Sequence, residues 1–178
     1  MRTLAFHEAI PGHHLQVALN LENEDLTLYR RFGYGTSAFS EGWALYSERL
    51  ALEAGLAEDP YDELGVLQSE LFRAVRLVVD TGIHFKRWTR EEAMAYMKDV
   101  TGMSDTEVRV EIERYIVWPG QACSYKVGML KILELRDKAK EKLGENFDIK
   151  DFHSIVLEQG QPPLFIVEEL VNGMIVKK

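Results

Sequence analysis

The stretch His7-Glu8-Ala9-Ile10-Pro11-Gly12-His13-His14 holds three of the chain's five histidines, with a glutamate beside the first of them. Imidazoles and a neighbouring carboxylate are the groups that a zinc-dependent hydrolase uses to hold its metal and to take a proton from water. In the common H-E-x-x-H pattern both histidines project from one face of a single helix. Pro11 stands where the second histidine of that pattern would be, so the plain motif does not apply.

The Pro11-Gly12 pair predicts an interruption of the helix that carries this motif. On an unbroken helix His7 and His14 share a face, but seven residues rise about 10.5 Å, which is too far for one zinc ion. If the pair bulges out as a two-residue insertion, His13 returns to the face of His7. We therefore expect His7 and His13 to be metal ligands. His14 is the alternative ligand, or it orients a ligand or contacts substrate.

The remaining ligand should come from outside this motif. A catalytic zinc site takes three protein ligands and leaves one position for water, whereas structural sites are usually closed by cysteines. The chain has one cysteine, Cys123. Glu41 is the best candidate, because the loop before its helix lets that helix pack antiparallel to the first.

Glu48 lies near the same face and could accept the second N–H of a ligating histidine. Glu8, beside the first ligand, would be the general base. The alternative interpretation is a structural polar cluster.

Composition narrows the class of protein. With 178 residues, 46% of them hydrophobic, the chain can form one domain with a core. A net charge of −8 without a Lys/Arg run argues against a nucleic-acid partner. No apolar run is long enough to span a membrane and no signal segment opens the chain, which makes the cytoplasm the default expectation. Little scaffold precedes the motif, so we expect residues 1–178 to be part of a longer protein or a subunit completed by another chain.

Helical signals dominate the whole sequence and predict an all-α domain of about seven helices. Asp59-Pro60 is a helix start, and Thr89 to Glu92 and Ser104 to Glu107 both fit the capping box. A loop over residues 22–36 separates the first two helices. The expected helices cover residues 3–21 with the interruption, about 37–55 with Ser37 or Ser40 as the cap, 60–87, a short stretch after 89, 105–118, 121–143, 149–158 and 164–176, of which 165–167 would also suit a strand.

A polar stripe runs along the predicted helix of residues 60–87. Its apolar sequence is interrupted by Arg73, Arg76, Asp80 and His84, which are spaced three, four and four residues apart. That spacing puts the four side chains on one side of an otherwise apolar helix. We interpret the helix as nearly buried, with its stripe facing something polar.

Taken together, the motifs resemble the DUF885 family of bacterial proteins over essentially the whole chain. Members of that family are normally several times longer, with a large helical region before this segment, which implies that the chain is their C-terminal catalytic portion. The family is similar to helical zinc metallopeptidases of the thimet-oligopeptidase and carboxypeptidase-Taq types. The resemblance rests on residues 7–16, 39–46 and 73–84, on Arg114-Tyr115, 119–122 and Tyr125, and on Phe152-His153, Gly160 and Pro163-Leu164.

The resemblance implies a zinc-dependent peptide hydrolase with a peptide substrate. His7, His13 and Glu41 would hold the zinc and Glu8 would be the base. Residues 119–125 resemble a loop that lies over the metal in the oligopeptidases. This makes Tyr125 the candidate oxyanion donor, with Tyr115 as the second choice.

The resemblance also suggests a role for the arginines. Arg73, Arg76 and Arg114 could bind a substrate carboxylate, together with His84. Asp80 could pair with His84 or Arg76 as a supporting residue. A buried structural ion network is the alternative for this stripe. The alternative function is a non-catalytic helical metal-binding domain, or an inactive portion that lacks its N-terminal half.

Overall fold

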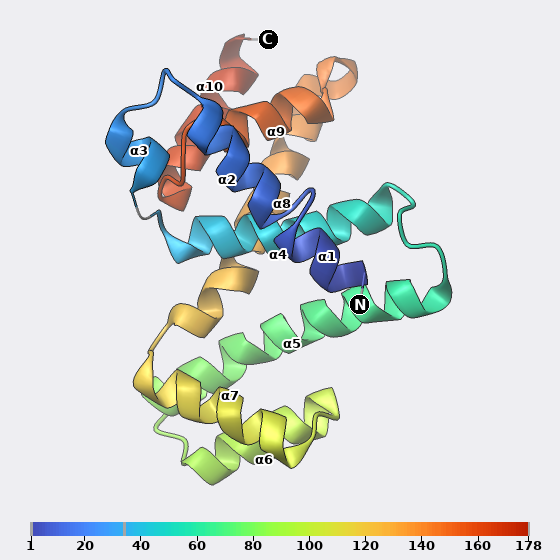
Figure 1. Cartoon of the computed structure of the whole chain (residues 1–178), viewed down its shortest axis with the longest axis vertical. Helices are drawn as coiled ribbons and strands as arrows, with labels where there is room; N and C mark the ends of the chain where they lie inside the picture. The colour runs from blue at the N-terminus through green and yellow to red at the C-terminus, as the bar shows by residue number, and fades with distance from the viewer. Residues whose placement is uncertain (1, 34, 178) are drawn as a thin grey trace.

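The computed structural model describes residues 2–33 and 35–177, and the regular structure within these ranges is helical (Figure 1). The predicted all-α class is confirmed, and the alternative of a strand at residues 165–167 is wrong because they lie inside a helix. The elements are α1 (Arg2–Glu8), α2 (His13–Glu22), α3 (Leu28–Phe32), α4 (Ser37–Glu53), α5 (Pro60–His84), α6 (Arg90–Thr101), α7 (Asp105–Val117), the 3₁₀ turn η1 (Gln121–Cys123), α8 (Ser124–Leu143), the 3₁₀ turn η2 (Gly144–Asn146), α9 (Ile149–Leu157) and α10 (Leu164–Lys177).

The described residues form more helical segments than the seven or so that the sequence predicts. The helix expected over 3–21 is two separate helices, α1 and α2. The loop expected over 22–36 contains α3, whose first turn is capped by the side chain of Thr27; Tyr34 of that loop is outside the described residues. The helix expected to reach residue 87 ends at His84, since Arg87 has a positive φ of 59°.

The helix starts follow the predicted capping signals, with one exception. Asp59 accepts hydrogen bonds from the first backbone N–H groups of α5, and both expected capping boxes, at Thr89 and Ser104, are present. The expected cap at Ser37 or Ser40 is wrong. Thr36 is the residue before α4, and its hydroxyl donates to a carbonyl near α10 instead.

Helix α4 is the central element, with α1 and α2 on one side and α8 crossing it on another (Figure 1). The crossing is close because two glycines face each other. A Cβ added to Gly42 would lie 2.5 Å from Cα of Gly128, and one added to Gly128 would lie 1.9 Å from the Ala38 carbonyl oxygen. This contact brings the first turn of α8, with Tyr125, close to α4.

Two apolar cores support this arrangement. The first joins α4, α8, α9 and α10, and the second joins α5, α6 and α7, at the opposite end of the molecule (Figure 1). Between them, α4 and α5 carry buried polar side chains that face α1 and the start of α8. The largest buried members of the cores are Phe39, Trp43, Leu45, Tyr46 and Phe152 in the first, and Met97, Ile112 and Tyr115 in the second.

Candidate metal centre

The histidine motif folds as two short helices joined by a sharp break. Helix α1 ends at Glu8 and α2 begins at His13, so the predicted interruption is confirmed, as a complete break instead of a bulge within one helix. Gly12 packs against the end of α1 so closely that an added Cβ would lie 1.8 Å from the His7 carbonyl oxygen. The two helices therefore meet closely at the break, and the ring centroids of His7 and His13 lie 4.9 Å apart.

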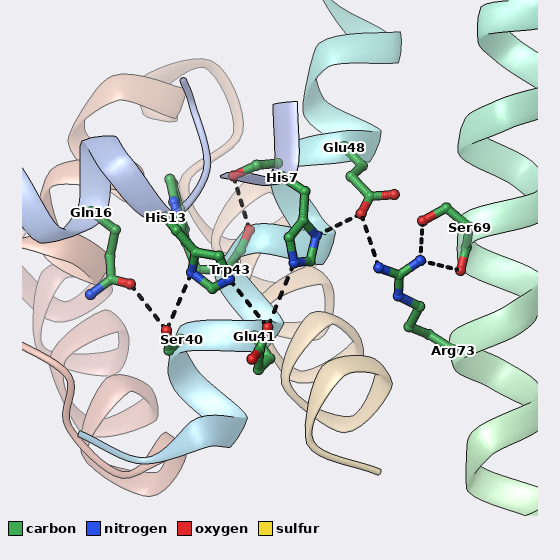
Figure 2. A network of polar contacts seen from close by, with 10 residues as sticks. His7, His13, Gln16, Ser40, Glu41, Trp43, Glu48, Ser69 and Arg73 are labelled. Carbon is green, nitrogen blue, oxygen red and sulfur yellow. Dashed lines mark hydrogen bonds and ion pairs between the residues drawn. The ribbon is translucent and has the colours of Figure 1, made fainter. Parts of the chain in front are cut away.

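Three side chains from α1, α2 and α4 converge at this break (Figure 2). Oε2 of Glu41 lies 3.6 Å from Nε2 of His7 and 3.2 Å from Nε2 of His13. One donor atom from each residue can be chosen so that all three lie within 4.8 Å of one another. The structure thus brings together the three residues that the sequence proposes as ligands. His14 is exposed on α2 and is not part of this group.

The other nitrogen of each imidazole has its own partner. Nδ1 of His7 lies 2.7 Å from Oε1 of Glu48, which is buried. A carboxylate accepts, so Nδ1 of His7 carries a proton and donates it to Glu48. Nδ1 of His13 lies 3.4 Å from the hydroxyl of Ser40, which is within reach of Oε1 of the buried Gln16. These contacts point both Nε2 atoms at Glu41, as ligating histidines require.

The carboxylates set the charge of the centre. Burial raises the pKa of Glu41, but hydrogen bonds from His13 and His7 outweigh it and lower that pKa to about 2. For His7, burial alone would lower the pKa; hydrogen bonds with Glu41 and Glu48 outweigh burial and raise it. The centre therefore favours an ionised Glu41 and a cationic partner beside it, which is the environment that a metal cation also needs.

A chain of polar contacts continues from Glu48 to α5 (Figure 2). NH2 of Arg73 lies 4.0 Å from Oε1 of Glu48, and NH1 of the same arginine donates to the hydroxyl of Ser69 at 2.6 Å. Arg73 thus balances the buried charge of Glu48 and has partners within the protein. Its contact with a substrate stays a prediction.

Tyr125 is the aromatic residue at the centre. Its ring is stacked on His7 with centroids 6.3 Å apart, and Cζ of Arg76 lies 4.7 Å from the centroid of the Tyr125 ring. Arg76 also lies 4.1 Å from the Phe72 ring centroid, so its charge rests between two aromatic rings. This arrangement holds Tyr125 beside the first histidine.

Tyr115 is fully buried in a different network. Its hydroxyl accepts from Nε of Arg76 at 2.9 Å and donates to Oε2 of Glu111. Burial is the main cause that raises the pKa of Tyr115 well above its usual value. NH2 of Arg76 pairs with the same Glu111 oxygen at 3.1 Å, as does Arg114 at 3.0 Å. The Tyr115 hydroxyl is therefore committed to a buried ion network.

The rest of the polar stripe also has partners within the protein. Asp80 accepts from the backbone N–H of Gly120 at 3.0 Å and 3.1 Å, so it pairs with neither His84 nor Arg76. His84 contacts the carbonyl oxygen of Tyr115 at 2.8 Å. Asp80 thus anchors the loop that leads to Tyr125, while His84 fixes the end of α7. A role of His84 in substrate binding stays a prediction.

Glu8 is exposed at the end of α1, next to the buried His7. Its adjacency to His7, the first of the proposed ligands, is the feature that the sequence identified.

Sequence reasoning missed four polar side chains that contact the site residues. Ser40 gave no signal, because its hydroxyl contacts His13 of another helix. Ser69 lies four residues before Arg73 on the same helix and accepts from it, but a serine at this spacing is not distinctive in the sequence. Glu111 had a signal, since it stands three and four residues before Arg114 and Tyr115, on the same face of a helix. Trp43, expected as a core residue, also donates from its indole Nε1 to the Pro11 carbonyl at 2.9 Å.

The geometry defines a helical centre with two imidazoles and a carboxylate, and comparison with known proteins places the chain in a family. Residues 1–171 match the family model described as "Bacterial protein of unknown function (DUF885)", so the chain belongs to the DUF885 family. No curated protein matches the chain.

Two solved structures resemble the chain closely. A candidate lipoprotein from Colwellia psychrerythraea shares 54% sequence identity over 99% of the chain, with a TM-score of 0.95. A candidate lipoprotein of unknown function from Shewanella oneidensis shares 32% identity over 96% of the chain, with a TM-score of 0.88. The chain spans 30% and 31% of the lengths of these two relatives.

These relatives bear on the expected location. Both are described as candidate lipoproteins, so they do not support the cytoplasmic location expected by default. Among the described helices, none is long and apolar enough to cross a membrane.

Proposed function

We propose that His7, His13 and Glu41 form a zinc site, and that the protein is a zinc-dependent peptide hydrolase. The observation that supports the site is the convergence of donor atoms from three separate helices. Ligands about 2.1 Å from a tetrahedral zinc lie roughly 3.4 Å from one another. The two separations from Glu41 Oε2, 3.6 Å and 3.2 Å, are close to that spacing.

The donor set favours a catalytic site over a structural one. Structural zinc sites are usually closed by cysteines, and catalytic sites take three protein ligands. Cys123 is in contact with Asp80 and is not a member of the converging group. Two imidazoles and one carboxylate match the ligand set of helical zinc hydrolases, and the Nδ1 contacts to Glu48 and Ser40 supply the outer partners such ligands need.

When bound, zinc would lower the pKa of water and polarise a substrate carbonyl. Glu8 would take a proton from the attacking water and deliver it to the leaving amine nitrogen, as the carbonyl–nitrogen bond breaks and a carboxyl group forms. Tyr125 would donate its hydroxyl proton as a hydrogen bond to the carbonyl oxygen as negative charge develops there. Binding of substrate carboxylates by Arg73, Arg76 or Arg114 belongs to the same proposal.

Metal uptake and hydrolysis are tested separately. Protein stripped by a chelator and dialysed against zinc should bind one equivalent by mass spectrometry. His13→Ala should abolish this uptake, while His14→Ala should leave it unchanged. Failure of the wild-type protein to take up metal would overturn the proposed site.

The chemistry is tested with Glu8→Gln, which keeps the size of the side chain and removes its basicity. We expect this variant to retain one zinc and to lose hydrolysis of an internally quenched peptide by at least about 100-fold. Glu22→Gln, at another exposed glutamate of this region, is the matched control and should keep full activity. Equal hydrolysis in wild type and Glu8→Gln would remove the proposed base, whereas metal binding without hydrolysis in the wild type would leave a metal-binding domain.

A further inference from the structure

The break between the two histidines is held by side chains from α4. Nε1–H of Trp43 donates to the Pro11 carbonyl oxygen at 2.9 Å, and the hydroxyl of Ser47 lies 3.2 Å from the same oxygen. Trp43 and Ser47 are four residues apart, so both project from one face of α4 toward the break. Two side-chain donors therefore converge on one backbone carbonyl between the proposed ligands His7 and His13.

The Pro11 carbonyl is turned out of the helical pattern. In a continuous helix it would accept from the backbone N–H four residues later, which belongs to Leu15. That N–H instead points to the Ala9 carbonyl oxygen, at 3.4 Å. A carbonyl removed from water needs another donor, or it destabilises the conformation that buries it. The conformation of the break thus depends on the donors that α4 supplies.

The two donors are not equivalent. The Ser47 hydroxyl has one proton, and it lies closer to the carbonyl of Trp43, at 2.9 Å, than to that of Pro11. The indole N–H of Trp43 has a single acceptor, and the residue is 1% exposed within the first core. Trp43 is therefore the rigid donor of the pair, and Ser47 is a secondary one.

The same helix contacts every part of the proposed ligand set. Glu41 faces Nε2 of both histidines, while Ser40 and Glu48 contact the Nδ1 atoms of His13 and His7. Trp43 fixes the segment between them, two residues along α4 from Glu41. One buried helix thus sets the position of the carboxylate, the orientation of each ring and the path of the backbone that joins the rings.

We propose that Trp43 is a positioning residue of the metal centre. Its indole N–H holds the Pro11 carbonyl, and through it the separation of His7 and His13. This inference rests on the proposed metal site and is independent of whether the protein hydrolyses peptides. It assigns to a core tryptophan a function that apolar packing alone does not require.

The test is cobalt(II) binding, because the visible absorption of the ion reports the geometry of its ligands. Trp43→Phe keeps an aromatic ring in the core and removes the N–H. We expect at least a tenfold loss of cobalt affinity and a changed absorption spectrum in protein that remains folded by circular dichroism. Ser47→Ala should reduce the affinity less than threefold. Trp88→Phe, the same change in the other core, should leave affinity and spectrum as in wild type.

The outcomes separate the inference from the proposed site. Cobalt affinity within twofold of wild type in folded Trp43→Phe, with an unchanged spectrum, would overturn the positioning role and leave the metal site intact. Wild-type protein that binds no cobalt would overturn both. If Trp43→Phe does not fold, benzothienylalanine can be incorporated at this position alone, which keeps the shape of the indole without its N–H. The cobalt affinity and the absorption spectrum of that protein then test the positioning role in the same way.

Discussion

Glu48 accepts a hydrogen bond from Nδ1 of His7 at 2.7 Å, from a position two turns along α4 from Glu41, whose Oε2 faces Nε2 of the same ring. One helix thus supplies both carboxylates on either side of a single imidazole. The contact with Glu48 fixes which nitrogen carries the proton, and it leaves Nε2 facing the group that includes His13.

The Glu48 contact predicts an effect on metal affinity. Glu48→Gln keeps the shape of the side chain but removes the charge that makes the imidazole a stronger ligand. We expect zinc affinity to fall about 10- to 100-fold, measured by competition with a chromophoric chelator. Glu53→Gln on the same helix is the control, because Glu53 also pairs with a buried arginine, Arg136, but does not contact the histidines. Equal affinities for Glu48→Gln and Glu53→Gln would contradict a role of Glu48 at the centre.

Gly12 predicts a second effect on the metal site. A Cβ here would lie 1.8 Å from the His7 carbonyl oxygen and 2.4 Å from that of Phe6, and these backbone atoms cannot move aside without shifting α1. Gly12→Ala should therefore separate the two helices and weaken zinc binding at least about tenfold, an effect expected of a ligand shell that loses its support.

The control for Gly12 is Gly173→Ala in α10, where an added Cβ meets no atom within 4 Å. There the expected result is unchanged zinc affinity and a gain of up to about 1 kcal/mol in the free energy of unfolding, from helix propensity. Wild-type zinc affinity in Gly12→Ala would show that the close approach at the break is not needed for the site.

The two tyrosines predict different losses. Tyr125 stacks on His7, whereas the hydroxyl of Tyr115 is bonded to Arg76 and Glu111. Tyr125→Phe should lower kcat for peptide hydrolysis about 100-fold or more with the zinc content unchanged, as for loss of an oxyanion donor. Tyr115→Phe should reduce the free energy of unfolding by about 1–3 kcal/mol, because it leaves Nε of the buried Arg76 without its acceptor, and should change kcat only a few fold. The reverse pattern would make Tyr115 the oxyanion donor.

The sequence predicted much of the centre because its signals are local. Two histidines, a neighbouring glutamate and the Pro-Gly pair lie within one stretch, residues 7–14, and their spacing alone requires a break before His7 and His13 can meet. Glu41 and Glu48 share a helix face, so choosing one as a ligand made the other a partner for the second ring nitrogen. The helix starts at Asp59, Thr89 and Ser104 were predictable for the same reason, since caps are formed by neighbouring residues.

What the sequence did not predict depends on how helices pack against each other. For Arg76 the sequence leaves two alternatives open, a substrate carboxylate and a buried ion network, because its partner Glu111 comes from α7 and nothing in the pattern of α5 shows that the two helices meet. The sequence predicted only an apolar core position for Trp43. Its hydrogen bond to the Pro11 carbonyl depends on the fold, which brings the two residues together. The extent of the break was also not predictable, because the tight approach at Gly12 depends on the tertiary position of α1 and α2.

A histidine outside the proposed site predicts the pH dependence of stability. Nε2 of His153 lies 2.8 Å from the hydroxyl of Tyr46, which accepts from Arg136 at 3.2 Å and so donates to a neutral imidazole. Burial, with the nearby charge of Arg136, lowers the pKa of His153 to about 4. Because the folded pKa is below the ordinary 6.5, the unfolded chain takes up this proton first as the pH falls. The stability from neutral His153 is therefore complete above about pH 6.5 and is lost progressively toward pH 4.

We expect His153→Gln to remove this part of the pH dependence. Between pH 7 and pH 5 the wild-type free energy of unfolding, measured by urea denaturation, should fall by about 1–2 kcal/mol more than that of the variant. Above pH 5 most carboxylates are still ionised, so the difference between the two proteins isolates the histidine. His14→Gln, at an exposed histidine, should follow the wild-type curve. If wild type and His153→Gln lose stability in parallel over this range, His153 is protonated equally in the folded and unfolded states, and its contact with Tyr46 does not require a neutral ring.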